Sequence, residues 1–297
     1  MIKDVMIFDS HAHMNDESFE EDRSPVIENL VSSGIGYFTE IGFDMPSSIK
    51  AVELAGRYAN VYAAVGFHPD HSDRCREEDI IQLKKMVEED RVGVSDVQGD
   101  SGHGKIVAIG EIGLDYHYTR DGIAERALKA GKEVTPEELE SADPDPEIQR
   151  ETFGKMLRLA RELKMPINVH SRDAAKDTYD MIVSEGGYEN GGIIHCFGYS
   201  LEMAKLYVKL GMCVGIGGVV TFKNSRKIKE VVENIPIENI VLETDCPYMA
   251  PVPLRGTRND PRNLIYVADK IAELKNMTAD EVIRITTENA KRVYRIG

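Results

Sequence analysis

Short apolar runs alternate along the chain with longer segments in which apolar residues recur at helical spacing. This alternation is typical of a parallel sheet whose strands are joined by crossover helices. Each short run is nearly continuous, as expected for a strand that is buried on both faces. The pattern predicts eight strands, at Val5–Asp9, Tyr37–Ile41, Val61–Val65, Ile106–Glu111, Ile167–His170, Gly192–His195, Cys213–Gly217 and Ile240–Asp245.

Helical spacing is clearest in the second half of the chain. Apolar residues fall on one face of Phe153–Lys164, and the segment 264–274 has the same pattern. Thr278 followed by Glu281 is typical of a capping box that opens a last helix. Eight strand–helix units favour an α/β fold of the closed (β/α)8 TIM-barrel type over an open sheet. No nucleotide-binding glycine motif follows the first strand, which removes the main reason to prefer the open sheet.

Two polar stretches flank the fourth predicted strand. Residues 91–105 are rich in glycine, and residues 121–145 are charged and contain Thr135-Pro136. We expect both to be surface insertions in a single domain that covers residues 1–297, rather than separate domains. The second insertion follows the C-terminal end of its strand, where it is placed to overhang an active site.

The net charge of −15 supplies no chain-wide attraction to nucleic acid. It argues against a tight, processive DNA-binding protein, but not against a hydrolase that meets the ends of strands. Any attraction to a polyphosphate chain must come from local arginines and from metal ions.

The four cysteines form no CxxC pair, which indicates reduced thiols rather than disulfides or a zinc ribbon. The first ten residues lack the apolar core of a signal peptide, and no apolar run approaches the roughly 20 residues that span a bilayer. We therefore expect a cytoplasmic protein with no membrane association and no obligate protein partner.

Residues able to bind metal or move protons follow most of the predicted strands. The C-terminal ends of barrel strands converge on one site, so residues far apart in the chain meet there. Six of these residues are expected to hold metal: His11, His13, Glu111, His170, His195 and Asp245.

Each candidate also has a plainer interpretation. His11 and His13 are two positions apart, so on a strand they point to the same side and can share one metal; alternatively, they are surface loop histidines. Glu111 would be costly to bury unpaired, so it either bridges two cations or pairs with a barrel lysine or arginine. His170 and His195, taken singly, are each more often core histidines bonded to backbone than ligands. The occurrence of all these residues at successive strand ends favours the metal site.

Asp245 can complete a metal shell or accept the proton of a metal-bound water. We expect Glu111 and Asp245 to be the catalytic residues. Mixed imidazole and carboxylate ligands suit Zn²⁺, Mn²⁺ or Fe²⁺, whereas Mg²⁺ prefers oxygen.

Substrate contacts are predicted at His68, Arg172 and Arg258. His68 either supports a ligand or touches substrate. Arg172 either holds a phosphate or pairs with Asp173. Arg258 belongs to the basic loop 255–259, which binds a phosphate or is simply solvated. Three other histidines are not expected to be ligands: His71, His103 and His117.

Several motifs together resemble the TatD family of metal-dependent deoxyribonucleases, within the amidohydrolase-like barrel superfamily. The matching segments occur in order along nearly the whole chain: Asp9-Ser10-His11-Ala12-His13, Gly66-Phe67-His68-Pro69, residues 110–116, Val169-His170-Ser171-Arg172-Asp173-Ala174, Ile194-His195-Cys196-Phe197-Gly198, residues 243–248, Arg255-Gly256 and Thr287-Glu288-Asn289-Ala290. The two insertions beside strand four depart from the pattern.

This resemblance implies a site with two divalent cations, Zn²⁺, Mn²⁺ or Mg²⁺. One cation would be held by His11, His13, Glu111 and Asp245, and the other by Glu111, His170 and His195. Glu111 would bridge them, where other superfamily members often have a carbamylated lysine. The implied activity is a deoxyribonuclease, in some relatives a 3′–5′ exonuclease, acting on single-stranded DNA or 3′ ends.

Two other functions remain open. The same metal site can hydrolyse a carboxylic ester or amide, and a pocket without arginine would favour that reaction. A binding protein built on an inactive barrel is the second alternative, although the complete ligand set speaks against it.

Overall fold

Eight parallel strands form one sheet in which each strand pairs with the next along the chain. The computed structural model describes residues 5–94 and 104–297. The strands are β1 (Ile7–Ala12), β2 (Ile35–Ile41), β3 (Val61–Val65), β4 (Ile106–Asp115), β5 (Ile167–Arg172), β6 (Gly192–Ile194), β7 (Cys213–Ile216) and β8 (Ile240–Leu242).

The sheet closes on itself just beyond β8. Ala12 forms a parallel bridge with Cys246. The Asp245 amide donates to the His11 carbonyl at 3.0 Å, and the His13 amide donates to the Cys246 carbonyl at 2.9 Å. The buried Asp9 carboxylate also accepts from the Thr244 amide at 2.9 Å. The chain therefore forms the predicted (β/α)8 barrel, and its closure brings the first and last motifs together.

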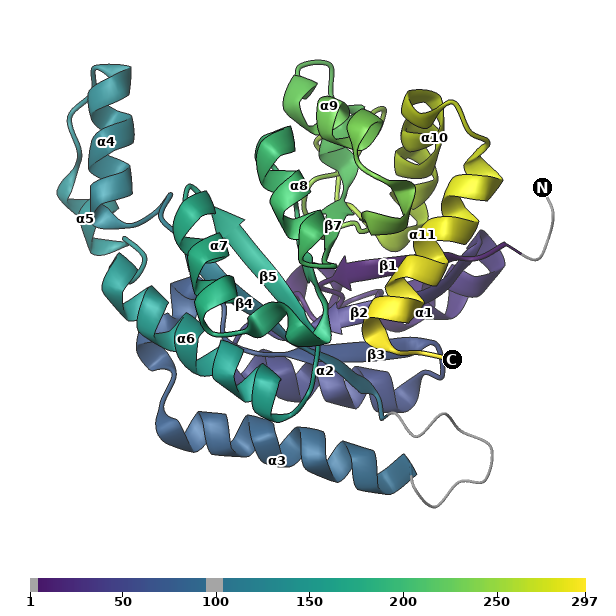
Figure 1. Cartoon of the computed structure of the whole chain (residues 1–297), viewed down its shortest axis with the longest axis horizontal. Helices are drawn as coiled ribbons and strands as arrows, with labels where there is room; N and C mark the ends of the chain where they lie inside the picture. Colours follow the sequence, from purple (N-terminus) through teal and green to yellow (C-terminus); the bar gives the residue numbers. More distant parts are fainter. Residues whose placement is uncertain (1–4, 95–103) are drawn as a thin grey trace.

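Helices surround the strands, as Figure 1 shows. They are α1 (Arg23–Leu30), α2 (Met45–Arg57), α3 (Glu77–Val94), α4 (Arg120–Ala130), α5 (Pro136–Glu140), α6 (Pro146–Glu162), α7 (Ala175–Ser184), α8 (Leu201–Lys209), α9 (Arg226–Asn234), α10 (Leu264–Lys275) and α11 (Ala279–Tyr294). The predicted helices correspond to α6, α10 and α11, and the capping box between Thr278 and Glu281 is present. No helix within the described ranges is long and apolar enough to cross a membrane.

The last helix packs against the strands and closes part of the barrel. Val293 and Tyr294 of α11 are buried in one apolar cluster with strand residues such as Phe8, Ala108 and Val241. The Tyr294 hydroxyl donates to the Ser10 carbonyl at 2.7 Å. Because α11 packs here, the C-terminal ends of the strands remain available for a functional site.

Several predicted strand ends were wrong by one to four residues, and those of β1, β4 and β8 differ most. β1 runs to Ala12 rather than Asp9. β4 continues past Glu111 to Asp115, with a register shift between Ile109 and Ile112. β8 ends at Leu242, before the predicted Asp245. Asp245 adopts the left-handed conformation, with φ 55°, which a continuing strand cannot contain. Chain closure and local turns, rather than hydrophobicity, set these ends.

The polar stretches beside β4 are partly helical. Arg91 belongs to α3, which runs to Val94, and residues 95–103 of the first insertion lie outside the described residues. The second insertion contains α4 and α5, which stand away from the body of the molecule in Figure 1. Its far end returns to the barrel, because the Asp143 amide donates to the Tyr118 carbonyl at 3.0 Å.

Candidate metal centre

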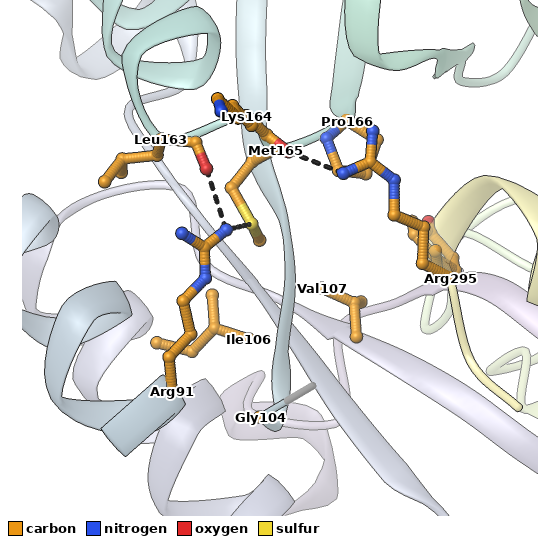
Figure 2. Close-up of a pocket in the computed structure, with 10 residues that line it drawn as sticks. Arg91, Gly104, Ile106, Val107, Leu163, Lys164, Met165, Pro166 and Arg295 are labelled. Atoms are coloured by element: carbon orange, nitrogen blue, oxygen red, sulfur yellow. Dashed lines mark hydrogen bonds between the residues drawn. The ribbon is translucent and has the colours of Figure 1, made fainter. Parts of the chain in front are cut away.

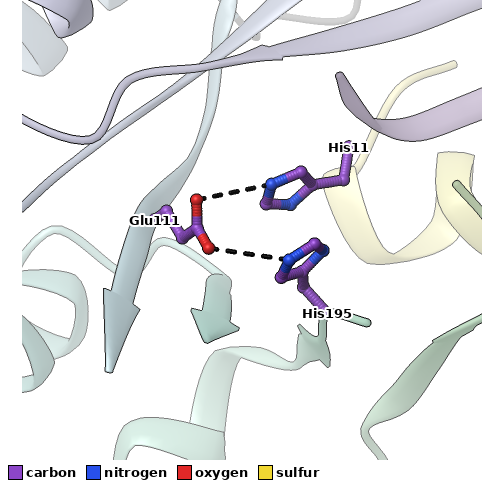
Figure 3. A group of neighbouring side chains, drawn as sticks. All are labelled: His11, Glu111 and His195. Carbon is purple, nitrogen blue, oxygen red and sulfur yellow. Dashed lines mark ion pairs between the residues drawn. The ribbon is translucent and has the colours of Figure 1, made fainter. Parts of the chain in front are cut away.

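Glu111 lies at the centre of the predicted ligands. Its Oε2 is 3.4 Å from His11 Nε2 and 3.6 Å from His13 Nε2. Its Oε1 is 3.1 Å from His170 Nδ1 and 3.6 Å from His195 Nε2. Figure 3 shows the rings of His11 and His195 pointing toward the two oxygens of the Glu111 carboxylate. Histidines thus face both oxygens, as required of a carboxylate that bridges two cations.

Asp245 completes the group from the other side. Its Oδ1 lies 3.5 Å from His13 Nε2 and 3.9 Å from both His11 Nε2 and His195 Nε2. The positive φ of Asp245 turns the chain just where β8 has ended. The structure therefore brings all six predicted ligands together, from β1, β4, β5 and the segments after β1, β6 and β8.

A small residue lets Glu111 occupy its central position. A Cβ added to Gly110 would lie 2.6 Å from the Asn168 carbonyl oxygen on β5. Glycine therefore allows β4 and β5 to approach closely beside Glu111.

Four of the imidazoles share one arrangement, which the sequence analysis missed. One ring nitrogen faces a side-chain oxygen of the protein, and the other faces Glu111. The pairs are His11 Nδ1 with Asn168 Oδ1 at 3.2 Å, His195 Nδ1 with Glu243 Oε1 at 3.2 Å, His68 Nδ1 with Asp70 Oδ1 at 2.6 Å and His170 Nε2 with Asp115 Oδ2 at 3.1 Å.

Such partners are expected around metal-binding histidines. An oxygen that accepts the proton of one ring nitrogen leaves the lone pair of the other nitrogen free for a cation. Asn168 and Glu243 each lie two residues before a predicted ligand, so they share a face with it on an extended chain. A polar residue at that spacing in an apolar run is the signal that could have identified them.

The donor set fits a divalent cation. Three of the groups that could hold an ion contain only predicted ligands or His68: His11, Glu111 and His195; His11, His13 and Asp245; His68, Glu111 and His170. Imidazole nitrogen with carboxylate oxygen is the combination that Zn²⁺ and similar transition metals prefer. Two of the groups share Glu111, which is consistent with a bridging position.

The histidines and the two carboxylates are buried together, and their opposite charges determine the ionisation of Glu111 and Asp245. Burial raises the pKa of Glu111, but the imidazoles of His68 and His11 outweigh it and hold this pKa well below its ordinary value. Burial also opposes ionisation of Asp245, and the charge of His195 with a hydrogen bond from His13 lowers its pKa nevertheless. Both carboxylates are therefore ionised near neutral pH and attract cations.

The same buried charges also change the pKa values of the histidines. Burial disfavours the charged form of His170, but hydrogen bonds to Asp115 and Glu111 raise its pKa to about 10. Burial likewise disfavours the charged form of His195, and the negative charge of Glu243 raises its pKa to about 9. A cation can take the place of these protons, so metal binding and proton release are coupled here.

His68, which was predicted to contact substrate, lies among the predicted metal ligands around Glu111. Its Nε2 is 3.6 Å from Glu111 Oε1, the same distance that separates His195 from that oxygen. The two other histidines within the described ranges lie apart from the ion-binding groups. His71 is 3.8 Å from Asp70, and His117 is 2.7 Å from Asp173. His103 lies outside the described residues.

The two predicted arginines are not part of the cluster. The Arg172 guanidinium lies over the Tyr118 ring, 4.9 Å from its centroid. Arg258 forms two hydrogen bonds with the Asp22 carboxylate and one with the Ser18 carbonyl.

A cavity of about 310 Å³ opens over the ligands. It is lined by His13, Asp16, Phe43, His68, Asp70, Glu111, His170, His195, Asp245 and Tyr248. No arginine is among these described residues. The cavity gives a small molecule direct access to Glu111 and Asp245.

A second cavity of about 310 Å³ lies beside the starts of β4 and β5 and is shown in Figure 2. There the Arg91 guanidinium donates to the Leu163 carbonyl at 2.8 Å, and that of Arg295 donates to the Lys164 carbonyl at 2.8 Å. These two arginines hold the turn between α6 and β5. Among the described residues, none that lines this cavity belongs to an ion-binding group.

A (β/α)8 barrel with histidines and acids gathered at the ends of its strands defines a class of metal-dependent hydrolases. Comparison with known proteins agrees: residues 8–295 match the family model described as TatD related DNase. The chain therefore belongs to the TatD family of metal-dependent hydrolases.

Relatives and solved structures extend over the whole chain. The uncharacterized metal-dependent hydrolase YabD of Bacillus subtilis (strain 168) is 40% identical over 292 residues, covering 98% of this chain and 100% of that protein. The uncharacterized metal-dependent hydrolase TatD of Mycobacterium tuberculosis is 31% identical over 294 residues, with 97% and 98% coverage. The crystal structure of YjjV, a TatD homologue from Escherichia coli, superposes with a TM-score of 0.80 at 24% identity, covering 98% of each chain.

Proposed function

We propose that this protein hydrolyses phosphodiester bonds of DNA, using two divalent cations that share Glu111. The observation that carries the proposal is the position of Glu111, whose two carboxylate oxygens face different histidines at 3.1–3.6 Å. Two cations about 3.5–4 Å apart are typical of enzymes that displace an oxygen at phosphorus.

The residues divide into two sets around Glu111. His11, His13, Glu111 and Asp245 would hold one cation, and Glu111, His170 and His195 the other, with His68 beside the second set. When bound, such ions neutralise charge on the phosphoryl oxygens and make a water acidic enough to ionise near neutral pH. Zn²⁺, Mn²⁺ and Mg²⁺ are the candidates.

Asp245 is the residue that we assign to proton transfer. Its carboxylate faces the cavity, and its lowered pKa keeps it ionised near neutral pH. It can orient the attacking water and accept its proton. Asn168 and Glu243 position His11 and His195 from behind and do not touch the substrate.

The substrate is proposed to be single-stranded DNA or the 3′ end of a strand, degraded in the 3′–5′ direction. Arg172 and Arg258 remain the proposed phosphate contacts. Arg172 has no carboxylate partner within the described residues, whereas Arg258 would have to leave Asp22. The proposal places the reaction in the cytoplasm, where the four free cysteines stay reduced.

The direct test is digestion of a 3′-labelled single-stranded oligonucleotide by protein stripped of metal and then supplied with Mn²⁺, Mg²⁺ or Zn²⁺. We expect early release of the labelled nucleotide with at least one metal and no release without metal. Intact oligonucleotide with every metal, from protein that binds these ions, would contradict the proposal.

One observation favours a second function. Within the described residues, no arginine lines the cavity over Glu111, as would suit a carboxylic ester or amide. Hydrolysis of neutral esters under the same metal conditions, without digestion of DNA, would select this alternative.

A further inference from the structure

We propose that Tyr118, Arg126 and Arg172 form a binding site for a single-stranded nucleic acid outside the metal centre. We call these three residues the Tyr118 cluster. The inference rests on the proposed function, because it describes where a DNA strand would continue beyond the hydrolysed bond. It also gives the second insertion a role.

The three side chains come from two parts of the fold. Arg172 is the last residue of β5, two positions after His170, and Arg126 lies within α4 of the insertion. Their guanidinium groups lie 4.9 Å and 5.3 Å from the centroid of the Tyr118 ring. Tyr118 is nevertheless 46% exposed. The cluster therefore presents a partly exposed aromatic ring, with two cations beside it, where the insertion meets the barrel.

Neither arginine forms an ion pair with a carboxylate of the described residues. Across residues 5–94 and 104–297, no carboxylate forms an ion pair or a hydrogen bond with Arg126 or Arg172, although the chain carries a net charge of −15. Arg126 Nη1 is shielded from water and has no hydrogen-bond acceptor within the same ranges. A shielded guanidinium nitrogen without an acceptor is uncommon in folded proteins. Because Arg126 as a whole is only partly buried, a phosphate oxygen can bind the other nitrogens of its guanidinium group.

The cluster lies a short distance from the metal centre. Asp115 contacts His170 through Oδ2 and accepts the His117 amide through Oδ1 at 2.8 Å. Tyr118 follows three residues after Asp115, so the two Cα atoms are at most about 11 Å apart. The rings of His117 and Tyr118 also touch, with centroids 4.8 Å apart. A strand held at Glu111 can therefore reach Tyr118 within a few nucleotides.

This combination of groups matches one kind of ligand. Single-stranded nucleic acid is typically bound by aromatic rings that stack on bases and by cations that hold the backbone. A duplex hides its bases from such a ring, and a free phosphate makes no use of it. The geometry therefore points to an unpaired strand.

The test is binding of a fluorescein-labelled oligothymidylate with phosphorothioate linkages, measured by fluorescence anisotropy on the metal-loaded protein at several salt concentrations. Tyr118→Ala should lower the affinity roughly 5- to 150-fold, the usual effect of losing a stacked base. Arg126→Gln should reduce the slope of log affinity against log salt by about 0.7, because one phosphate contact is lost.

Two further variants keep the test specific. Tyr118→Phe retains the ring and should bind almost as the unaltered protein does, which also separates stacking from misfolding. Arg57→Gln removes the same charge from an exposed position on α2, paired with Glu53, and should leave the affinity and the salt slope unchanged. Equal affinity in Tyr118→Ala, Arg126→Gln and Arg57→Gln would overturn the proposal.

Hydrolysis of bis(4-nitrophenyl) phosphate separates this inference from the proposed function. This ester carries no further nucleotides that could stack on Tyr118, so Tyr118→Ala should reduce kcat/KM for an oligonucleotide more than for the small ester. An equal reduction for both would overturn the inference. If the unaltered protein binds the strand at Tyr118 but hydrolyses neither substrate with any metal, the proposed function fails and the binding site stands.

Discussion

Asn168 Oδ1 lies 3.2 Å from His11 Nδ1 in the buried interior of the barrel. The Asn168 amide nitrogen donates to the Tyr294 hydroxyl at 3.0 Å, so the orientation of the amide is fixed and its oxygen faces His11. Nδ1 of His11 therefore carries the proton, and Nε2 is free to face Glu111. Tyr294 of the last helix thus acts through Asn168 to set the ring state of His11, a predicted ligand on the first strand.

Asn168→Ala should weaken metal binding roughly 10- to 100-fold, because His11 loses the acceptor that fixes its ring. Isothermal titration of the metal-free protein with Zn²⁺ or Mn²⁺ would measure this. Asn234→Ala, which alters an exposed asparagine on α9, should have no effect. Unchanged affinity in Asn168→Ala would show that the contact does not support the ligand.

Asp245→Asn should lower the rate of hydrolysis roughly 100- to 10,000-fold, because the variant cannot accept the proton of the attacking water. Glu111→Gln should abolish turnover and weaken metal binding, because the carboxylate that is proposed to hold both cations loses its charge. Rates and bound metal are measured on the same samples, with Glu185→Gln as a surface control. Near-normal rates in both site variants would remove these residues from the mechanism.

Gly215→Ala should disturb the predicted metal centre through Glu243, which lies next to His195. A Cβ at Gly215 would lie 2.0 Å from Glu243 Oε2, so Glu243 must move away from His195. We expect a loss of about 1–3 kcal/mol in stability, as for other overpacked interiors, together with weaker metal binding. Gly56→Ala on α2 is the matched control, because no atom lies within 4 Å of its added Cβ. Denaturant unfolding and metal titration of both variants would decide the point.

Removal of metal by a chelator should lower the melting temperature. Cations that bind only the folded protein stabilise it by about 2.7 kcal/mol at a concentration 100 times their Kd. Glu111→Gln should show a smaller shift, because it binds metal less tightly. An identical melting temperature with and without chelator would argue against occupation of the site.

Asp143 should make stability depend on pH. Burial and the negative charges of Asp70 and Asp115 raise the pKa of Asp143 from 3.8 to about 6. The folded protein therefore binds this proton more tightly than the unfolded chain, and stability falls as pH rises between these values. Asp143→Asn should remove the loss and stabilise the protein above pH 6 by at most about 1 kcal/mol, since the group is half-exposed.

The measurement for Asp143 is the melting temperature at a series of pH values. The advantage of Asp143→Asn over the unaltered protein should disappear below pH 4. Glu133→Gln removes a charge from an exposed position in the same insertion and serves as the comparison. A constant difference at every pH would contradict the assignment.

The clustered residues could be predicted because they stand next to apolar runs, as His11 and Glu111 do. Barrel topology then requires strand ends to converge, so order along the chain was enough to place these residues at one site. The partners behind them were harder to find. Asn168 and Glu243 lie in strand-like segments in which their polarity indicates only burial with some partner, and the sequence does not name that partner.

By itself, the sequence predicted the barrel and the six residues that the structure brings together, because the hydrophobic period and the positions of chemically distinctive residues are local properties of the chain. Only the tertiary structure decided that Asn168 fixes His11, that Arg258 is occupied by Asp22 and that Arg126 meets Arg172 at Tyr118. The first two contacts join residues that are 157 and 236 positions apart, and the third brings residues of α4 and β5 together at Tyr118. Such contacts depend on how the barrel closes and on how the insertion packs against it. A local sequence pattern contains no information about either.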